Sequence, residues 1–162
     1  MIRDEFLWLR KCSTSGEDIS AMDAFYATII EDLKNVVSAE SWQFEEREQF
    51  EREQTLTVAK EKIVEVMLCL RDKHEFRFLI DLCGVDWPQR ESRFDVVYHL
   101  LAPKNKKRLR VKCMVGENES IPSIHHVWKS ANWHEREAWD LFGIKFSGHP
   151  DLRRILTHHE FQ

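Results

Sequence analysis

Two segments of alternating apolar and polar residues, joined by a short polar connection, constrain the fold of this chain more than any other feature. Residues 93–101 (RFDVVYHLL) and 108–115 (RLRVKCMV) flank the connection APKNKK. Side chains alternate between the two faces of a β-strand, and a short polar link favours a hairpin. In the second segment one face consists of apolar residues, namely Leu109, Val111, Cys113 and Val115. The pattern predicts an antiparallel hairpin with one buried face and a second face toward water or a partner.

Helical periodicity is found on the N-terminal side of this hairpin. Residues 20–37 carry apolar side chains at steps of three, one and four, which is typical of a helix with a wide core-facing stripe. Ser20 and Asp23 resemble a capping box at its start. Residues 60–73 predict a second helix with one apolar face, formed by Ile63, Val66, Met67 and Leu70.

Three further segments lie upstream of the hairpin. Residues 55–59 (TLTVA) alternate like a short strand, whereas the charge-dense residues 44–54 are interpreted as a solvated connector. Residues 76–90 form an apolar run that Gly84 and Pro88 close into a turn. The pattern of this buried run is compatible with either a strand or a helix.

These elements place the chain in the α+β class. We expect one compact domain with a mainly antiparallel β-sheet, helices packed on it and a helical C-terminal segment. Residues 1–54 form an N-terminal helical and charged connector region in this interpretation, and residues 55–162 form the α+β domain. A chain of 162 residues buries about 68–70% of its unfolded surface, so its core requires no disulfide or metal.

Charge and cysteine placement exclude several functional classes. The net charge of −4 argues against nucleic-acid binding, and the basic run 104–112 is interpreted as a turn and a strand edge. The four cysteines, at positions 12, 69, 83 and 113, lack the close spacing of zinc or iron–sulfur motifs and are typical of a reducing compartment. No apolar window resembles a signal peptide or a membrane span, so we expect the cytosolic side of a membrane or the cytosol.

Residues 131–156 (ANWHEREAWDLFGIKFSGHPDLRRIL) concentrate acids, bases and aromatic residues. Asn132 and Glu135 resemble a capping box, which predicts a helix from about Trp133 that Gly143 ends in the left-handed conformation. Arg136 and Asp140 are spaced to meet on its surface. The remaining expectations are an apolar side with Ala138, Trp139, Leu141 and Phe142, a short strand at 144–146, and a helical turn that begins at Pro150.

A metal site is the enzymatic alternative for this part of the chain. His125, His126 and His134 are its candidate ligands, and they would point to a metal-dependent hydrolase. Their spacing matches no HExxH motif, and adjacent histidines point in different directions on any regular element. The sequence also lacks a glycine-rich phosphate loop, a nucleophile elbow and a dinucleotide fingerprint.

The same stretch closely resembles the signature of the 30 kDa subunit family of the proton-pumping NADH:quinone oxidoreductase, respiratory complex I. The matching residues are Glu135, Arg136, Glu137, Asp140, Leu141, Phe142, His149, Arg153, Ile155 and Leu156. Residues 78–88 (FLIDLCGVDWP), the first hairpin strand and residues 123–140 are similar to further family segments. The resemblance covers about residues 55–158.

This resemblance implies a subunit without cofactors or an active site of its own. FMN, iron–sulfur clusters and quinone would be bound by other subunits of the complex. The chain would dock on the subunit that lines the quinone pocket and on neighbouring subunits of the hydrophilic arm, and would support electron transfer from NADH to quinone coupled to proton translocation. It would be a peripheral subunit on the cytoplasmic side of the bacterial inner membrane, or on the matrix side in mitochondria.

The expected partner interface lies in the signature segment. Its candidate residues are Glu135, Arg136, Glu137, Asp140, His149, Pro150, Asp151, Arg153 and Arg154. An alternative is that several of these charges hold the C-terminal elements against the domain's own sheet. Two functional alternatives also remain: an equivalent subunit of a related membrane-bound hydrogenase or other-donor dehydrogenase complex, and the histidine-metal hydrolase.

Overall fold

The predicted hairpin is the centre of the molecule. The computed structural model describes residues 24–47, 53–158 and 160. Strands β4 (Phe94–Ala102) and β5 (Lys107–Val115) pair antiparallel as expected, with Tyr98 opposite Val111. The apolar face of β5 is buried as predicted, because Leu109, Val111, Cys113 and Val115 are at most 1% exposed. Its alternate residues, such as Arg110 and Lys112, remain partly exposed on the other face.

Five strands form the main sheet in the order β1-β2-β5-β4-β3. The parallel pair is β2 (Glu53–Val58) with β5, while the other three pairings are antiparallel. The short strand expected at 55–59 is confirmed by β2. The solvated connector expected at 44–54 is wrong where the structure describes it, because β1 (Trp42–Arg47) pairs with β2 and packs Trp42 and Phe44 against the core. Residues 48–52 of that expectation lie outside the described residues.

The apolar run at 76–90, for which strand and helix were both open, contains β3 (Phe78–Asp86). This end strand pairs with β4 and has a register shift between Leu79 and Asp81. Gly84 lies within β3 and permits a close approach, because a Cβ atom there would be 2.9 Å from a ring carbon of Phe142. The strand can therefore pack directly against the C-terminal part of the chain.

Helices α1 (Ala24–Val36) and α2 (Ile63–Lys73) supply apolar side chains to one core with the sheet. The predicted face of α2 is confirmed, since Ile63, Val66, Met67 and Leu70 have no exposed surface. Tyr26 of α1 is buried, and its hydroxyl donates a hydrogen bond to the carbonyl of Arg108 at 2.8 Å. The capping box expected at Ser20 and Asp23 lies outside the described residues.

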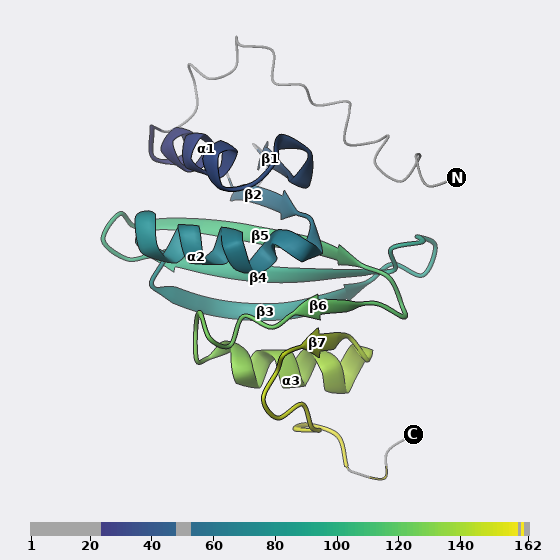
Figure 1. Ribbon diagram of the computed structural model, residues 1–162. Helices are drawn as coiled ribbons and strands as arrows, with labels where there is room; N and C mark the ends of the chain where they lie inside the picture. Colours follow the sequence, from purple (N-terminus) through teal and green to yellow (C-terminus); the bar gives the residue numbers. More distant parts are fainter. Residues whose placement is uncertain (1–23, 48–52, 159, 161–162) are drawn as a thin grey trace.

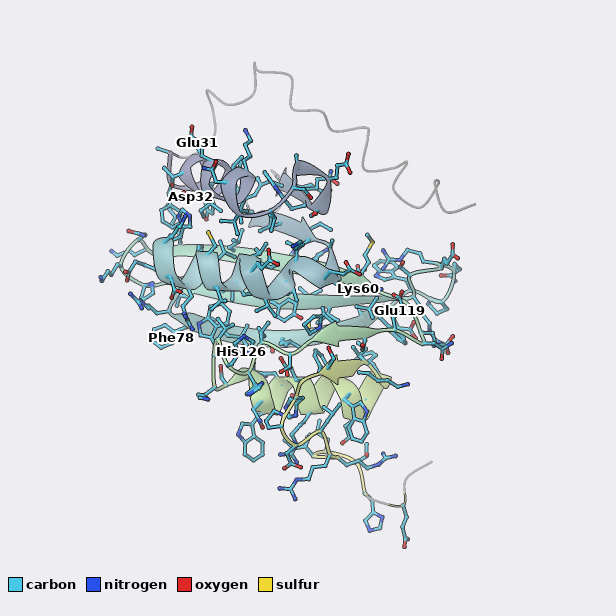
Figure 2. The ribbon with its side chains drawn as sticks, in the orientation of Figure 1. Glu31, Asp32, Lys60, Phe78, Glu119 and His126 are labelled. Atoms are coloured by element: carbon cyan, nitrogen blue, oxygen red, sulfur yellow. The ribbon has the colours of Figure 1, made fainter. Side chains whose placement is uncertain are left out.

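Helix α3 (Ala131–Phe142) lies beside β3, on the side away from β4 (Figure 1). Next to it, β6 (Ser120–Pro122) and β7 (Lys145–Ser147) form a parallel pair. Single-turn helices η3 (Ala39–Ser41) and η4 (Lys60–Lys62) precede β1 and α2. Lys60 of η4 forms an ion pair with Glu119 at 2.5 Å, which connects the start of α2 to the turn before β6 (Figure 2).

The α+β expectation is confirmed by a mixed, mainly antiparallel sheet with helices packed on it. In the part of the chain that the structure describes, none of the helices combines the length and the apolar character that crossing a membrane requires.

Candidate functional site

The charge-dense stretch at 131–156 forms the candidate site, and α3 is its scaffold. The helix begins at Ala131 after Ser130, whose side chain makes no capping hydrogen bond. The predicted capping role of Asn132 is wrong, because this residue lies inside the first turn. The predicted helix end at Gly143 is confirmed: its φ is +74°, and its N–H donates to the carbonyl of Trp139 at 2.8 Å.

The expected apolar side of α3 is correct only in part. Ala138 is buried, and Trp139 and Phe142 pack against the core while remaining partly exposed. Leu141, by contrast, is 52% exposed and is not part of the core. One apolar residue of the signature therefore lies on the surface.

Glu135 is a buried carboxylate that links α3 to the segment after β6. It has no exposed surface, and its two oxygens accept hydrogen bonds from the Ser123 hydroxyl at 2.5 Å and the Ile124 N–H at 2.7 Å. Burial raises the pKa of Glu135 to about 7, although both hydrogen bonds act in the opposite direction. This carboxyl therefore titrates near neutral pH while it anchors Ser123 and Ile124.

His149 lies next to this carboxyl and is bound as a neutral imidazole. Its side chain has no exposed surface, and its Nδ1 accepts a hydrogen bond from the N–H of Asp151 at 3.1 Å. The proton must then be on Nε2, which donates to the carbonyl of Asn132 at 3.1 Å. The same Nε2 is 3.9 Å from Glu135, so His149 connects the start of α3 to the segment after β7.

Arg136 binds the C-terminal segment through its backbone. Its Nε and Nη2 donate to the carbonyls of Arg153 and Arg154, both at 3.0 Å. The guanidinium lies over the ring of Trp133, with 5.1 Å from Cζ to the ring centre. Arg136 is only 7% exposed, and the two carbonyls accept two of its five N–H donors.

Asp140 completes this attachment one turn later. One of its oxygens accepts hydrogen bonds from the N–H groups of Ile155, Leu156 and Thr157 at 2.8–3.0 Å. The other accepts from the Thr157 hydroxyl and from Arg154 at 3.3 Å. Loss of water contact would raise the pKa of Asp140, but the donors from 155–157 outweigh it and hold that pKa well below its ordinary value.

These contacts form what we call the C-terminal clamp: Glu135, Arg136, Asp140 and His149. The predicted surface pair between Arg136 and Asp140 is wrong, because both side chains bind the backbone of residues 153–157 instead. The predicted helical turn at Pro150 is also wrong, since residues 151–154 have no regular secondary structure. Backbone groups of residues 153–157 form hydrogen bonds with side chains of α3, in place of the backbone hydrogen bonds that they would form within a helix. For the clamp residues, the structure favours the alternative of an internal scaffold.

The remaining interface candidates lie on the surface. Glu137, Pro150, Asp151 and Arg153 are exposed, and Arg154 is partly exposed. The side chain of Arg153 is 71% exposed, with its Nε 2.9 Å from a carboxylate oxygen of Asp151. A pair this exposed contributes little to folding, so Arg153 is available to a partner. The assignment of these residues to an interface stays a prediction.

The candidate metal ligands do not form a site. His125 and His126 are neighbours with ring centres 5.7 Å apart, but His134 lies on α3 with its Nδ1 3.9 Å from Asp81. Within residues 24–47, 53–158 and 160, no group of three or more His, Cys, Asp or Glu side chains is arranged to hold a metal ion. The Nδ1 of His125 lies instead 3.1 Å from the hydroxyl of Ser123.

Sequence reasoning missed three residues of this region. Ser123 and Thr157 bind the clamp from 12 and 17 positions away along the chain, so no local spacing rule identifies them. Trp133 is 61% exposed, and helical periodicity could have found it because Trp133 and Leu141 are eight residues apart on one side of α3.

Comparison with known proteins gives a consistent result. Residues 56–162 match the family described as the respiratory-chain NADH dehydrogenase 30 kDa subunit. A protein of Sinorhizobium medicae that is named as a subunit of NADH-quinone oxidoreductase is 54% identical over 112 residues, which is 68% of this chain and 56% of that protein. The protein of the same name from Phenylobacterium zucineum is 52% identical over 109 residues, 67% of this chain and 52% of the relative. The chain thus spans about half the length of the curated relatives that it matches.

A solved structure has the same fold. A chain of the membrane-bound sulfane sulfur reductase, an archaeal respiratory membrane complex, superposes with a TM-score of 0.65. The match covers 83% of this chain and 77% of that chain at 21% identity, which supports the fold alone.

Proposed function

The chain belongs to the family of the respiratory-chain NADH dehydrogenase 30 kDa subunit, and we propose from this membership that it is part of a proton-pumping NADH:quinone oxidoreductase. Its role in this proposal is architectural. It docks on the subunit that lines the quinone pocket and stabilises the hydrophilic arm, through which electrons pass from NADH to quinone.

The proposal is supported by the contacts that the residues of the family signature make within the chain. Arg136 and Asp140 fix residues 153–157 along α3, where Arg153 and Glu137 remain exposed. A fixed segment that presents charged side chains loses less conformational entropy when a partner binds than a free segment would. Arginine suits this position because its planar fork binds carboxylates through two hydrogen bonds.

Cofactor chemistry is assigned to other subunits in this proposal. FMN, the iron–sulfur clusters and quinone are bound elsewhere in the complex, and this chain supplies neither ligands nor a catalytic group. The wide spacing of the four cysteines along the chain supports this assignment, because iron–sulfur motifs place their cysteines close together. The chain reaches the cytoplasmic face of the bacterial inner membrane, or the matrix face in mitochondria, through its partners.

Purification from native membranes tests the proposal. We expect the tagged full-length chain to copurify with flavin and iron–sulfur subunits and with NADH:quinone activity. Arg153→Glu should lower recovery of these subunits about tenfold, because a reversed charge at an interface is unfavourable. The matched control, Lys34→Glu, changes an exposed cation on α1 and should leave recovery unchanged. Purification of the wild-type chain without respiratory subunits would refute the proposal, and equal recovery with both variants would remove Arg153 from the interface.

A further inference from the structure

The large apolar side chains that remain exposed in the described part of the chain belong to adjacent elements. They belong to β3, to the turn after it, to α3 and to the C-terminal segment. They are Phe78, Ile80, Val85, Trp87, Trp133, Leu141 and Leu156, with exposures between 36% and 61%. Scattered exposed apolar residues are ordinary, but their restriction to adjacent elements is typical of an interaction surface.

Helix α3 and strand β3 make this surface continuous. His134, near the start of α3, lies 3.9 Å from Asp81, and Phe142, at its end, packs on Gly84. The helix therefore runs beside the strand in the same direction. Leu141 and Asp86 line the same shallow depression, which places the last turn of α3 next to the end of β3.

Strand register shows which β3 side chains border this surface. Asp81, Cys83 and Val85 lie opposite His99, Val97 and Asp95 of β4, so they project from one face of the sheet. Phe78 lies opposite Leu101 and projects from that same face, because the register shift falls between Leu79 and Asp81. We call the surface formed by Phe78, Asp81, Val85, Glu137 and Leu141 the β3–α3 seam.

Two carboxylates lie between the apolar ends of this seam. The side chain of Asp81 is 51% exposed, and its nearest cationic candidate is His134 at 3.9 Å. Glu137 is exposed and forms no ion pair with any residue that the structure describes. Both acids lie close enough to Cys83 to influence its thiol. The pKa of Cys83 is raised chiefly by burial, then by Asp81 and also by Glu137, while Arg110 lowers it.

The chemistry of the occupant follows from this arrangement. A cationic side chain would be attracted to Asp81 and Glu137 at the seam, while Arg110 and Lys112 of β5 lie farther across the same face of the sheet. Apolar side chains on both sides of that cation would cover Phe78, Val85 and Leu141. Protein interfaces commonly combine such apolar contacts with arginine.

We propose that the β3–α3 seam docks a segment of a neighbouring protein of the respiratory complex, with an arginine or lysine placed between apolar side chains. The inference rests on the proposed function and deepens it, because it assigns a second contact surface in addition to Arg153. The cation binds between Asp81 and Glu137, and the flanking apolar residues cover the two ends of the seam.

Site-specific photo-crosslinking in native membranes tests this proposal. The full-length chain carries p-benzoylphenylalanine in place of Leu141, or in place of Glu31 as the control. Glu31 is exposed on α1, far from Phe78 and the seam (Figure 2). We expect the probe at position 141 to label one protein of the complex, on a peptide that contains an arginine or lysine among apolar residues. The probe at position 31 should not label that peptide.

Charge reversal provides a second measurement. Glu137→Lys should lower recovery of the complex at least about tenfold with an unchanged melting temperature, since Glu137 has no ion pair within the described chain. Glu31→Lys should leave recovery unchanged.

The outcomes separate the two proposals. If the complex copurifies but the probe at position 141 forms no crosslink, the seam proposal is overturned while the proposed function stands. The same conclusion follows if that probe labels lipid or an acidic peptide. Equal recovery of Glu137→Lys and Glu31→Lys would overturn it as well. Purification of the wild-type chain without respiratory subunits would overturn both.

Discussion

Replacement of Glu135 by glutamine should make the stability of this protein respond differently to pH. Glutamine is nearly isosteric with glutamate, and its carbonyl oxygen can still accept the N–H of Ile124, which is 2.7 Å from the carboxylate in the wild type. Its amide can donate to the hydroxyl of Ser123, which reverses the direction of the 2.5 Å hydrogen bond. The variant therefore removes the titration of a buried group and changes the packing little.

The magnitude follows from the pKa of Glu135. The ordinary value of 4.5 applies to the unfolded chain, and burial raises the pKa to about 7 in the folded protein. Between these values the folded state binds more protons than the unfolded state, so stability falls as pH rises. The stabilising contribution is complete below pH 4.5 and is lost as pH rises through about 7. A pKa difference of about 2.5 corresponds to about 3 kcal/mol.

Denaturant unfolding of both proteins between pH 4.5 and 8 measures this contribution. We expect the free energy of unfolding of Glu135→Gln, relative to wild type, to increase by about 3 kcal/mol from the acidic to the basic end. The difference between the proteins cancels contributions that they share, such as that of His125, whose pKa is lowered chiefly by burial. A pH-independent difference, or one that decreases with pH, would refute a raised pKa at Glu135.

Two further predictions concern the clamp and the sheet. Asp140→Asn removes the charge that accepts three backbone N–H groups, so amide exchange and proteolysis at residues 155–157 should accelerate at neutral pH while the sheet stays protected. Equal protection of that segment in both proteins would contradict the clamp. Val111→Asp should unfold the chain, because Val111 has no exposed surface and an unpaired buried charge costs several kcal/mol, whereas Lys112→Asp on the other face should leave circular dichroism unchanged. Equal loss of melting temperature in these two variants would show that the face assignment is wrong.

The parts of the fold that sequence predicted are those with an uninterrupted local period. The β4–β5 hairpin alternates over both strands, and α2 places Ile63, Met67 and Leu70 at helical spacing. β1 was missed because Trp42 and Phe44 are separated and followed by charged residues, so composition concealed the alternation. Its strand conformation depends on pairing with β2, which no local pattern reveals.

In the candidate site, too, features set by neighbouring residues were predictable, whereas contacts between distant residues were not. The left-handed turn at Gly143 is a local property, and the sequence predicted it. Glu135 and Asp140 were assigned to neighbours three or four residues away, as helix rules suggest. Their actual partners are 11 to 17 residues away, because residues 121–124 and 153–157 fold back onto α3. Buried carboxylates bind whichever N–H groups the tertiary fold brings to them.

The charged residues in and after α3 fall into two groups, one that points inward and one that is exposed. One short segment can in this way contribute to folding and also be available for assembly. Arg136 and Asp140 point inward and bind the backbone of residues 153–157, so their replacement should act on assembly only through displacement of that segment. Glu137 and Arg153 are exposed, so their replacement should weaken assembly with little change in folding. Variants of the inward-pointing residues should therefore lower both the melting temperature and the recovery of the complex. Variants of the exposed residues should lower recovery alone. Under the proposed function, the family signature therefore both holds the C-terminal segment in place and supplies the charges that contact a partner.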